Sequence, residues 1–131
     1  MAVLYEGSTP RFLLRIRDGS GVQLNPNLSA GQVTEVKVWI YNSITGAIIA
    51  KRYLNTPPAP LDIWAQMTTK EVTSGDHRIQ IALTAAETTD KTPNANEIQI
   101  ELTVPDGATP PGTVKDVGKG KFYDINPAKT E

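Results

Sequence analysis

The feature that most constrains this chain is a repeated alternation of apolar and polar residues with a period of two. It occurs in four stretches, at residues 11–17, 34–41, 77–84 and 97–104. Alternate side chains of an extended strand point to opposite faces, so this period is typical of strands that bury one face. The apolar residues that share one face of each stretch, and that we expect in the core, are Phe12, Leu14, Ile16, Val36, Val38, Ile40, Ile79, Ile81, Leu83, Ile98, Ile100, Leu102 and Val104. The sequence therefore predicts an all-β protein.

Turn signals between these stretches predict how the strands pair. The loop 42–46 ends in a glycine and suits a hairpin that joins 34–41 to an antiparallel strand at 47–54. We expect a second hairpin between 77–84 and 97–104.

The segments between the hairpins predict less regular structure. Prolines in 55–60 remove backbone donors, so we expect an extended crossover there, leading to a weaker strand at 61–67. Residues 85–87 are expected to form no more than one helical turn, because Pro93 and the polar residues before it follow closely.

Length and charge limit the organisation and the partners. A chain of 131 residues suits one domain, which we divide into a lead-in at 1–9, a β-sandwich at 10–104 and an extended Pro/Gly-rich tail at 105–131. The 13 basic and 14 acidic residues give a net charge of −1, so we expect neither nucleic acid nor a membrane surface as a partner. The N-terminus lacks the basic and apolar regions of a signal peptide, and no stretch approaches the ~20 apolar residues of a membrane span.

Residues that carry chemistry are sparse. His77 is the only histidine, which excludes a multi-histidine metal site. It is in phase with the aliphatic residues of its strand, so we expect a partly buried structural histidine. The carboxylates do not alternate as in a calcium loop, and the chain has no cysteine. We therefore expect no catalytic residue, metal or cofactor, and a protein that is not an enzyme.

A row of arginines is the first candidate interaction site. Arg11, Arg15 and Arg17 share one face of the first stretch with Leu13, and such a row is suited to binding carboxylates on a partner. The alternative is a solvated strand face whose charges meet residues of a neighbouring strand, namely Glu97, Gln99 and Glu101. Both interpretations remain open at this point.

Two aromatic residues form the second candidate site. Trp39 and Tyr41 fall opposite the expected core, and large exposed aromatic residues indicate an interface. The alternative is that the strand twists or bulges near its end, so that the 55–67 crossover with Trp64 covers Trp39. Stacking of a sugar ring on these aromatic residues is a third possibility.

The tail is the third candidate site. It has no sustained apolar pattern, and its anchors are limited to Phe122, Tyr123 and Ile125. A neighbouring subunit is therefore the expected holder of the tail, through backbone hydrogen bonds made by residues from Lys121 to Ile125.

Several segments resemble known families. Residues 72–81, Val-Thr-Ser-Gly-Asp-His-Arg-Ile-Gln-Ile, resemble the corner and penultimate strand of immunoglobulin-like domains, with His77 in place of the usual tyrosine. Residues 10–24, together with the Val-Lys-Val-Trp-Ile-Tyr segment at 36–41 and Thr45-Gly46, look like immunoglobulin-like modules in virion appendages of tailed bacteriophages. The likeness covers residues 10–104 at the level of pattern.

This resemblance implies an immunoglobulin-like antiparallel β-sandwich of about seven or eight strands. It further implies a non-enzymatic structural protein of a phage capsid decoration, fibre anchor or baseplate. Such a protein is made in the host cytoplasm and docks in multiple copies onto other virion subunits. The alternative is a carbohydrate-binding or adhesive module that uses Trp39, Trp64 or Tyr41 as stacking platforms.

Overall fold

The computed structural model describes residues 3–5, 7–17, 21–54, 64–88, 96–105, 113–121 and 124–126. Its strands in chain order are β1 (Val3–Tyr5), β2 (Arg11–Leu14), β3 (Ile16–Arg17), β4 (Gln23–Leu24), β5 (Glu35–Asn42), β6 (Ile48–Leu54), β7 (Ala65–Gln66), β8 (Thr68–Thr73), β9 (Asp76–Ala82), β10 (Asn96–Pro105), β11 (Thr113–Lys121) and β12 (Asp124–Asn126). Two short 3₁₀ turns, η1 (Leu28–Ala30) and η3 (Ala86–Thr88), are the helical elements of these residues. The all-β prediction is confirmed.

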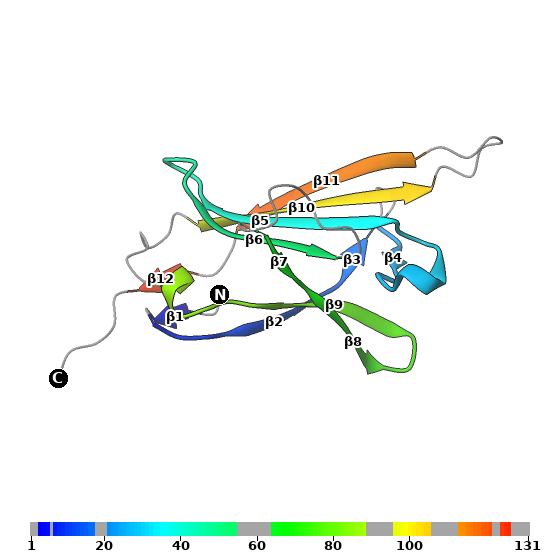
Figure 1. Ribbon diagram of the computed structural model, residues 1–131, viewed down its shortest axis with the longest axis horizontal. Helices are drawn as coiled ribbons and strands as arrows, with labels where there is room; N and C mark the ends of the chain where they lie inside the picture. Colours follow the sequence, from blue (N-terminus) through cyan, green and yellow to red (C-terminus); the bar gives the residue numbers. More distant parts are fainter. Residues whose placement is uncertain are drawn as a thin grey trace.

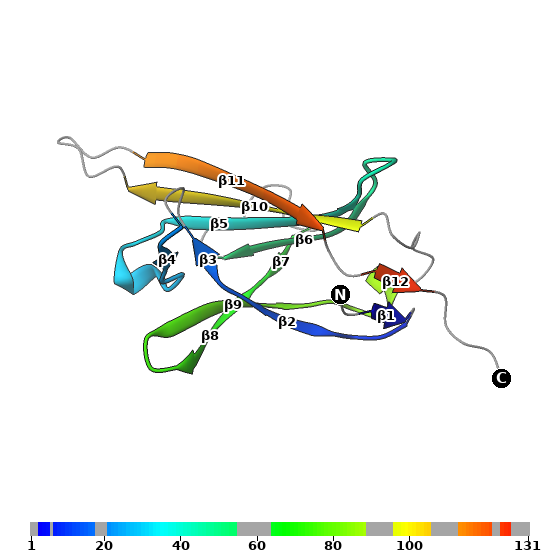
Figure 2. The same ribbon diagram turned by 180° about the vertical axis from the view of Figure 1, so that it is seen from behind.

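Two sheets form the body of the protein. The larger has the strand order β11-β10-β5-β6-β7, and the smaller has the order β2-β9-β8. Figures 1 and 2 show them as two layers, with the larger sheet above and the smaller sheet below. Neighbouring strands are antiparallel except for the short parallel pair of β6 and β7. Two further two-stranded sheets, β3-β4 and β1-β12, complete the described strands.

The core between the layers is built from the aliphatic residues that alternate along the strands. Phe12, Ile79 and Ile81 supply it from the smaller sheet, and β5 contributes three more residues, of which Ile40 is one. Burying a large aliphatic side chain stabilises the fold by roughly 1.5–3 kcal/mol. All the core residues expected from the alternation are buried or pack against the buried cluster, so that prediction is confirmed.

The hairpin predicted around the 42–46 loop is also confirmed. β5 and β6 pair antiparallel from Val36 opposite Leu54 to Tyr41 opposite Ile48, with an irregularity after Ile40. Gly46 has a φ of 76°, a left-handed conformation that glycine adopts without steric cost. The loop therefore depends on this glycine.

The predicted hairpin between 77–84 and 97–104 is wrong. β9 pairs with β2 and β8 in the smaller sheet, whereas β10 pairs with β5 and β11 in the larger sheet. Both strands have one continuous aliphatic face. That face would be buried whether the two strands were neighbours in one sheet or faced each other across the core. The period of two identifies the buried face of a strand but not its neighbour.

The chain passes between the layers at a buried methionine. β7 pairs with β6 in the larger sheet, and β8 begins two residues after β7 in the smaller sheet. Met67, which lies between them, is 2% exposed, and its N–H donates to the carbonyl of Tyr53 at 2.7 Å. Within the described residues, the weaker strand expected at 61–67 is thus limited to Ala65–Gln66.

The expected extended tail contains two strands that pair within the chain. All nine residues of β11 lie antiparallel to β10, from Thr113 opposite Pro105 to Lys121 opposite Glu97. β12, which includes Ile125, pairs parallel with β1. Sequence patterning missed these strands because a ladder is made by backbone groups and does not require aliphatic alternation. Phe122 and Tyr123 lie outside the described residues.

A buried arginine links the two sheets. Arg52 of β6 is 6% exposed, and its Nη2 donates to the carbonyl of Ala82, at the end of β9, at 2.9 Å. The same nitrogen forms an ion pair with Glu87 of η3. The carboxylate of Glu87 also accepts a hydrogen bond from the N–H of Thr84 at 2.8 Å. The guanidinium therefore satisfies polar groups that would otherwise be left unpaired between the layers.

We expect Arg52→Met to lower the free energy of unfolding by about 3 kcal/mol, because it removes the cation that pairs with a partly buried carboxylate and leaves the carbonyl of Ala82 without its side-chain donor. Urea denaturation followed by circular dichroism measures this change. Lys51→Met is the matched control, since Lys51 lies on the opposite face of β6 and its contact with Trp64 contributes about 0.5–1 kcal/mol. Equal losses in the two variants would contradict the linking role of Arg52.

Candidate interaction surfaces

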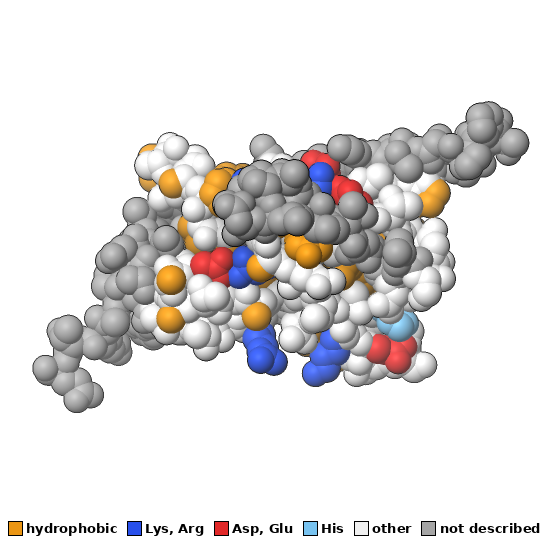
Figure 3. Space-filling view, viewed as in Figure 1, with side chains coloured by type: hydrophobic (Ala, Val, Ile, Leu, Met, Phe, Trp, Pro, Cys, Tyr) orange, Lys and Arg blue, Asp and Glu red, His pale blue; other side chains and the backbone are white. Residues whose placement is uncertain are grey.

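The outer face of the smaller sheet carries a concentration of basic residues. The cross-strand register places Lys70 of β8 directly opposite Arg78 of β9. Arg11 of β2 lies opposite Ala82, four residues farther along β9. Figure 3 shows Lys and Arg side chains protruding from the lower side of the molecule, where the smaller sheet lies. We call Arg11, Arg15, Lys70 and Arg78 the basic face.

A single carboxylate organises part of the basic face. Asp76 accepts hydrogen bonds from Arg15 Nη2 at 3.1 Å, from Arg78 Nη2 at 2.7 Å and from Gln23 Nε2 at 2.9 Å. The hydrogen bonds from Arg78, followed by those from Arg15 and Gln23, hold the pKa of Asp76 well below its usual range. The bond to Asp76 also raises the pKa of Arg15. Two guanidinium groups are thus fixed beside each other by one shared anion.

The three arginines predicted as a row have different environments. Arg11 is exposed on β2, whereas Arg15 lies in a break between β2 and β3 and binds Asp76. Arg17 donates from Nη1 to the carbonyl of Gly21 at 3.1 Å. The alternative that these charges meet β10 is wrong, because β10 belongs to the other sheet. Neither Asp76 nor Lys70 was identified from the sequence, since both lie far from the arginines along the chain.

The aromatic residues of the larger sheet contact one another. The rings of Trp39 and Trp64 meet edge to face, with centroids 5.3 Å apart and planes at 76°. The ammonium of Lys51 lies 5.3 Å from the Trp64 ring centroid, a cation–π distance. Trp39 is therefore half-buried under Trp64, as the second interpretation of the sequence predicts.

Tyr41 also has a partner within the chain. Its hydroxyl donates to Glu97 Oε2 on the neighbouring strand at 2.8 Å. This hydrogen bond is the main reason that the pKa of Tyr41 is raised, because it stabilises the protonated phenol. Tyr41 is half-buried rather than fully exposed.

His77 is partly buried, as predicted, with a side chain 24% exposed. Its Nε2 lies 3.0 Å from Glu71 Oε2, and its Nδ1 lies 3.3 Å from Asn27 Nδ2. The amide oxygen of Asn27 in turn accepts a hydrogen bond from Thr69 at 2.7 Å. These contacts join the β8–β9 hairpin to the loop before η1.

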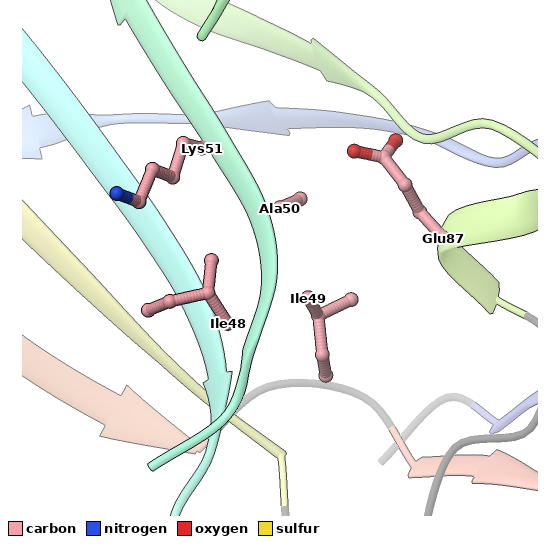
Figure 4. A pocket seen from close by; sticks show the side chains of 5 residues that line it. All are labelled: Ile48, Ile49, Ala50, Lys51 and Glu87. Atoms are coloured by element: carbon pink, nitrogen blue, oxygen red, sulfur yellow. The ribbon is translucent and has the colours of Figure 1, made fainter. Parts of the chain in front are cut away.

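A hollow of about 270 Å³ lies beside β6, lined by Ile48, Ile49, Ala50, Lys51 and Glu87. Figure 4 shows Ile49 and Glu87 projecting from β6 and η3 around this space. The carboxylate of Glu87 is bound by Arg52 and by the N–H of Thr84, so we assign it a structural role. Ile44, at the tip of the adjacent hairpin, is 78% exposed, a feature that the sequence pattern did not single out.

Within the described part of the chain, no group of three His, Asp or Glu residues is arranged to hold a metal ion. In the same residues no helix is long and apolar enough to cross a membrane. Searches of protein-family models, curated proteins and solved structures find no match to this chain. A functional proposal therefore rests on the surfaces described above.

The shared carboxylate predicts a pH dependence. Asp76 has a lower pKa in the folded protein than the ordinary value of about 3.9, so its stabilising contribution is complete above that value and is lost as the pH falls below it. We expect the free energy of unfolding to decrease less steeply between about pH 5 and 2 in Asp76→Asn than in the wild type. Urea titrations at each pH measure the slope, and an unchanged slope would contradict this role.

Proposed function

We propose that this chain is a non-enzymatic structural protein of a bacteriophage virion, an immunoglobulin-like β-sandwich that docks onto other virion subunits. The observation that supports the docking role best is the position of β11. This nine-residue strand is at the edge of the larger sheet, and its outer side has no partner strand among the described residues.

An open strand edge is a template for protein association. Its backbone N–H and C=O groups are available to a strand of another chain, which adds through main-chain hydrogen bonds. Gly118 in β11 is exposed, and no atom lies within 4 Å of the position that a Cβ would occupy. The backbone is therefore accessible near the middle of the strand.

The pairing of β11 with β10 means that docking would occur differently from what the sequence suggests. We expected a tail that a neighbouring subunit holds, whereas β10 already pairs with β11 within the chain. A partner strand would instead add to the free side of β11. The virion assignment and the immunoglobulin-like class are supported by the resemblance of residues 10–104 to phage appendage modules.

The carbohydrate-binding alternative has less support. The rings of Trp39 and Trp64 pack edge to face against each other, so they do not form a flat platform on which a sugar ring could stack. The hydroxyl of Tyr41 is bound to Glu97. Structural docking remains the function that the geometry favours.

We expect Gly118→Arg to fold normally and to reduce incorporation into particles by about tenfold or more, which corresponds to about 1.4 kcal/mol of binding free energy. The measurement is quantitative mass spectrometry of purified virions of the phage that encodes the chain. Thr45→Arg, at the exposed β5–β6 turn, is the matched control and should be incorporated as the wild type is.

Two outcomes would contradict different parts of the proposal. Absence of the wild-type chain from purified virions would exclude the virion role. Normal incorporation of Gly118→Arg, with the circular dichroism of both variants unchanged, would exclude docking at the edge of β11.

A further inference from the structure

We infer that the basic face of the smaller sheet binds an extended, carboxylate-bearing segment of a partner protein. This inference does not depend on the proposed function, because the basic face and β11 are on different sheets. It follows from the excess of cations, from their spacing and from the way in which two of them are held in place.

The first argument is uncompensated charge. Lys70 and Arg78 are direct cross-strand neighbours, and like charges in that position destabilise a sheet. Asp76 compensates Arg15 and Arg78. Within the described part of the chain, Lys70 and Arg11 take part in none of the ion pairs. An anionic partner would relieve this repulsion.

The second argument is preorganisation. Arg15 uses Nε and Nη2 to bind Asp76, and Arg78 uses the same two nitrogens. Each guanidinium is therefore held in one orientation while its Nη1 group remains available to an incoming acceptor. Side chains that are already ordered lose less conformational entropy on binding, which increases affinity.

The third argument is spacing. Arg11 begins β2 and Arg15 directly follows its last residue, and four residues of extended chain span about 13 Å. Between them on the same face lies Leu13, which is half-buried and is paired with Gln80. A partner strand with acidic residues at positions i and i+4 and an apolar residue at i+2 matches this order. The sheet thus favours the pattern acid-x-apolar-x-acid.

Charge also distinguishes between classes of partner. The chain has a net charge of −1, so it does not attract a nucleic acid over long distances. A continuous row of phosphates would also bring negative charge close to Asp76, which is bound to both Arg15 and Arg78. A short segment with two separated carboxylates avoids that repulsion.

The test is an NMR titration of the ¹⁵N-labelled full chain with the capped peptide Thr-Glu-Thr-Val-Thr-Glu-Thr. We expect the signals of β2, β8 and β9 to shift, and we expect Lys70→Glu to weaken binding about tenfold or more. Lys37→Glu is the matched control, because it makes the same change of charge on β5 in the larger sheet. It should bind the peptide within about twofold of the wild-type affinity, a difference of less than 0.5 kcal/mol.

A second peptide tests the spacing. Thr-Thr-Glu-Glu-Val-Thr-Thr has the same composition with adjacent glutamates, and we expect it to bind at least about threefold more weakly. The inference is overturned if the two peptides bind equally, if Lys37→Glu weakens binding as much as Lys70→Glu, or if a DNA duplex binds more tightly than the first peptide. A dimer of the chain that Lys70→Glu dissociates would also overturn it, because the occupant would then be a second copy.

Discussion

The structure depends on one constraint, which is that the aliphatic faces of two sheets are buried against each other. Ile40 of the larger sheet and Ile79 and Ile81 of the smaller sheet are fully buried in the same cluster. Removal of this apolar surface from water is the dominant favourable contribution to folding. Because the aliphatic residues face inward, the alternate residues of each strand face outward, and Arg11, Lys70 and Arg78 of the basic face are such outward residues.

Two networks of polar interactions add to this packing, one around Arg52 and one around Asp76. Arg52 is buried between the layers, where the low polarity makes any unpaired donor or acceptor costly, so its partners at Ala82 and Glu87 are needed for the fold. The carboxylate of Asp76 is partly buried, whereas Arg15 is exposed to solvent, which weakens their ion pair, and Asp76 fixes the orientation of the two arginines that donate to it. The Arg52 network therefore links the two sheets, and the Asp76 network adds stability that is lost in acid and holds two cations of the basic face beside each other.

The candidate sites were predictable only in part. Arg11 and Arg15 were identified because they share one strand face, and the cover of Trp39 by Trp64 was one of three interpretations of the sequence. Lys70 was not identified, since its position opposite Arg78 depends on how β8 pairs with β9. β11 was also missed, because backbone pairing leaves little trace in the pattern of side chains.

The sequence by itself determined that this is an all-β protein, which residues of the four alternating stretches enter its core and where the β5–β6 hairpin turns. Each of these follows from local rules, namely the period of two along a strand and the conformational freedom of Gly46. Only the tertiary structure decided that β9 and β10 lie in different sheets, that β11 completes the larger sheet and that Asp76 joins two arginines. These features depend on contacts between residues far apart in the chain, and several pairings of the same strands would bury the same aliphatic faces.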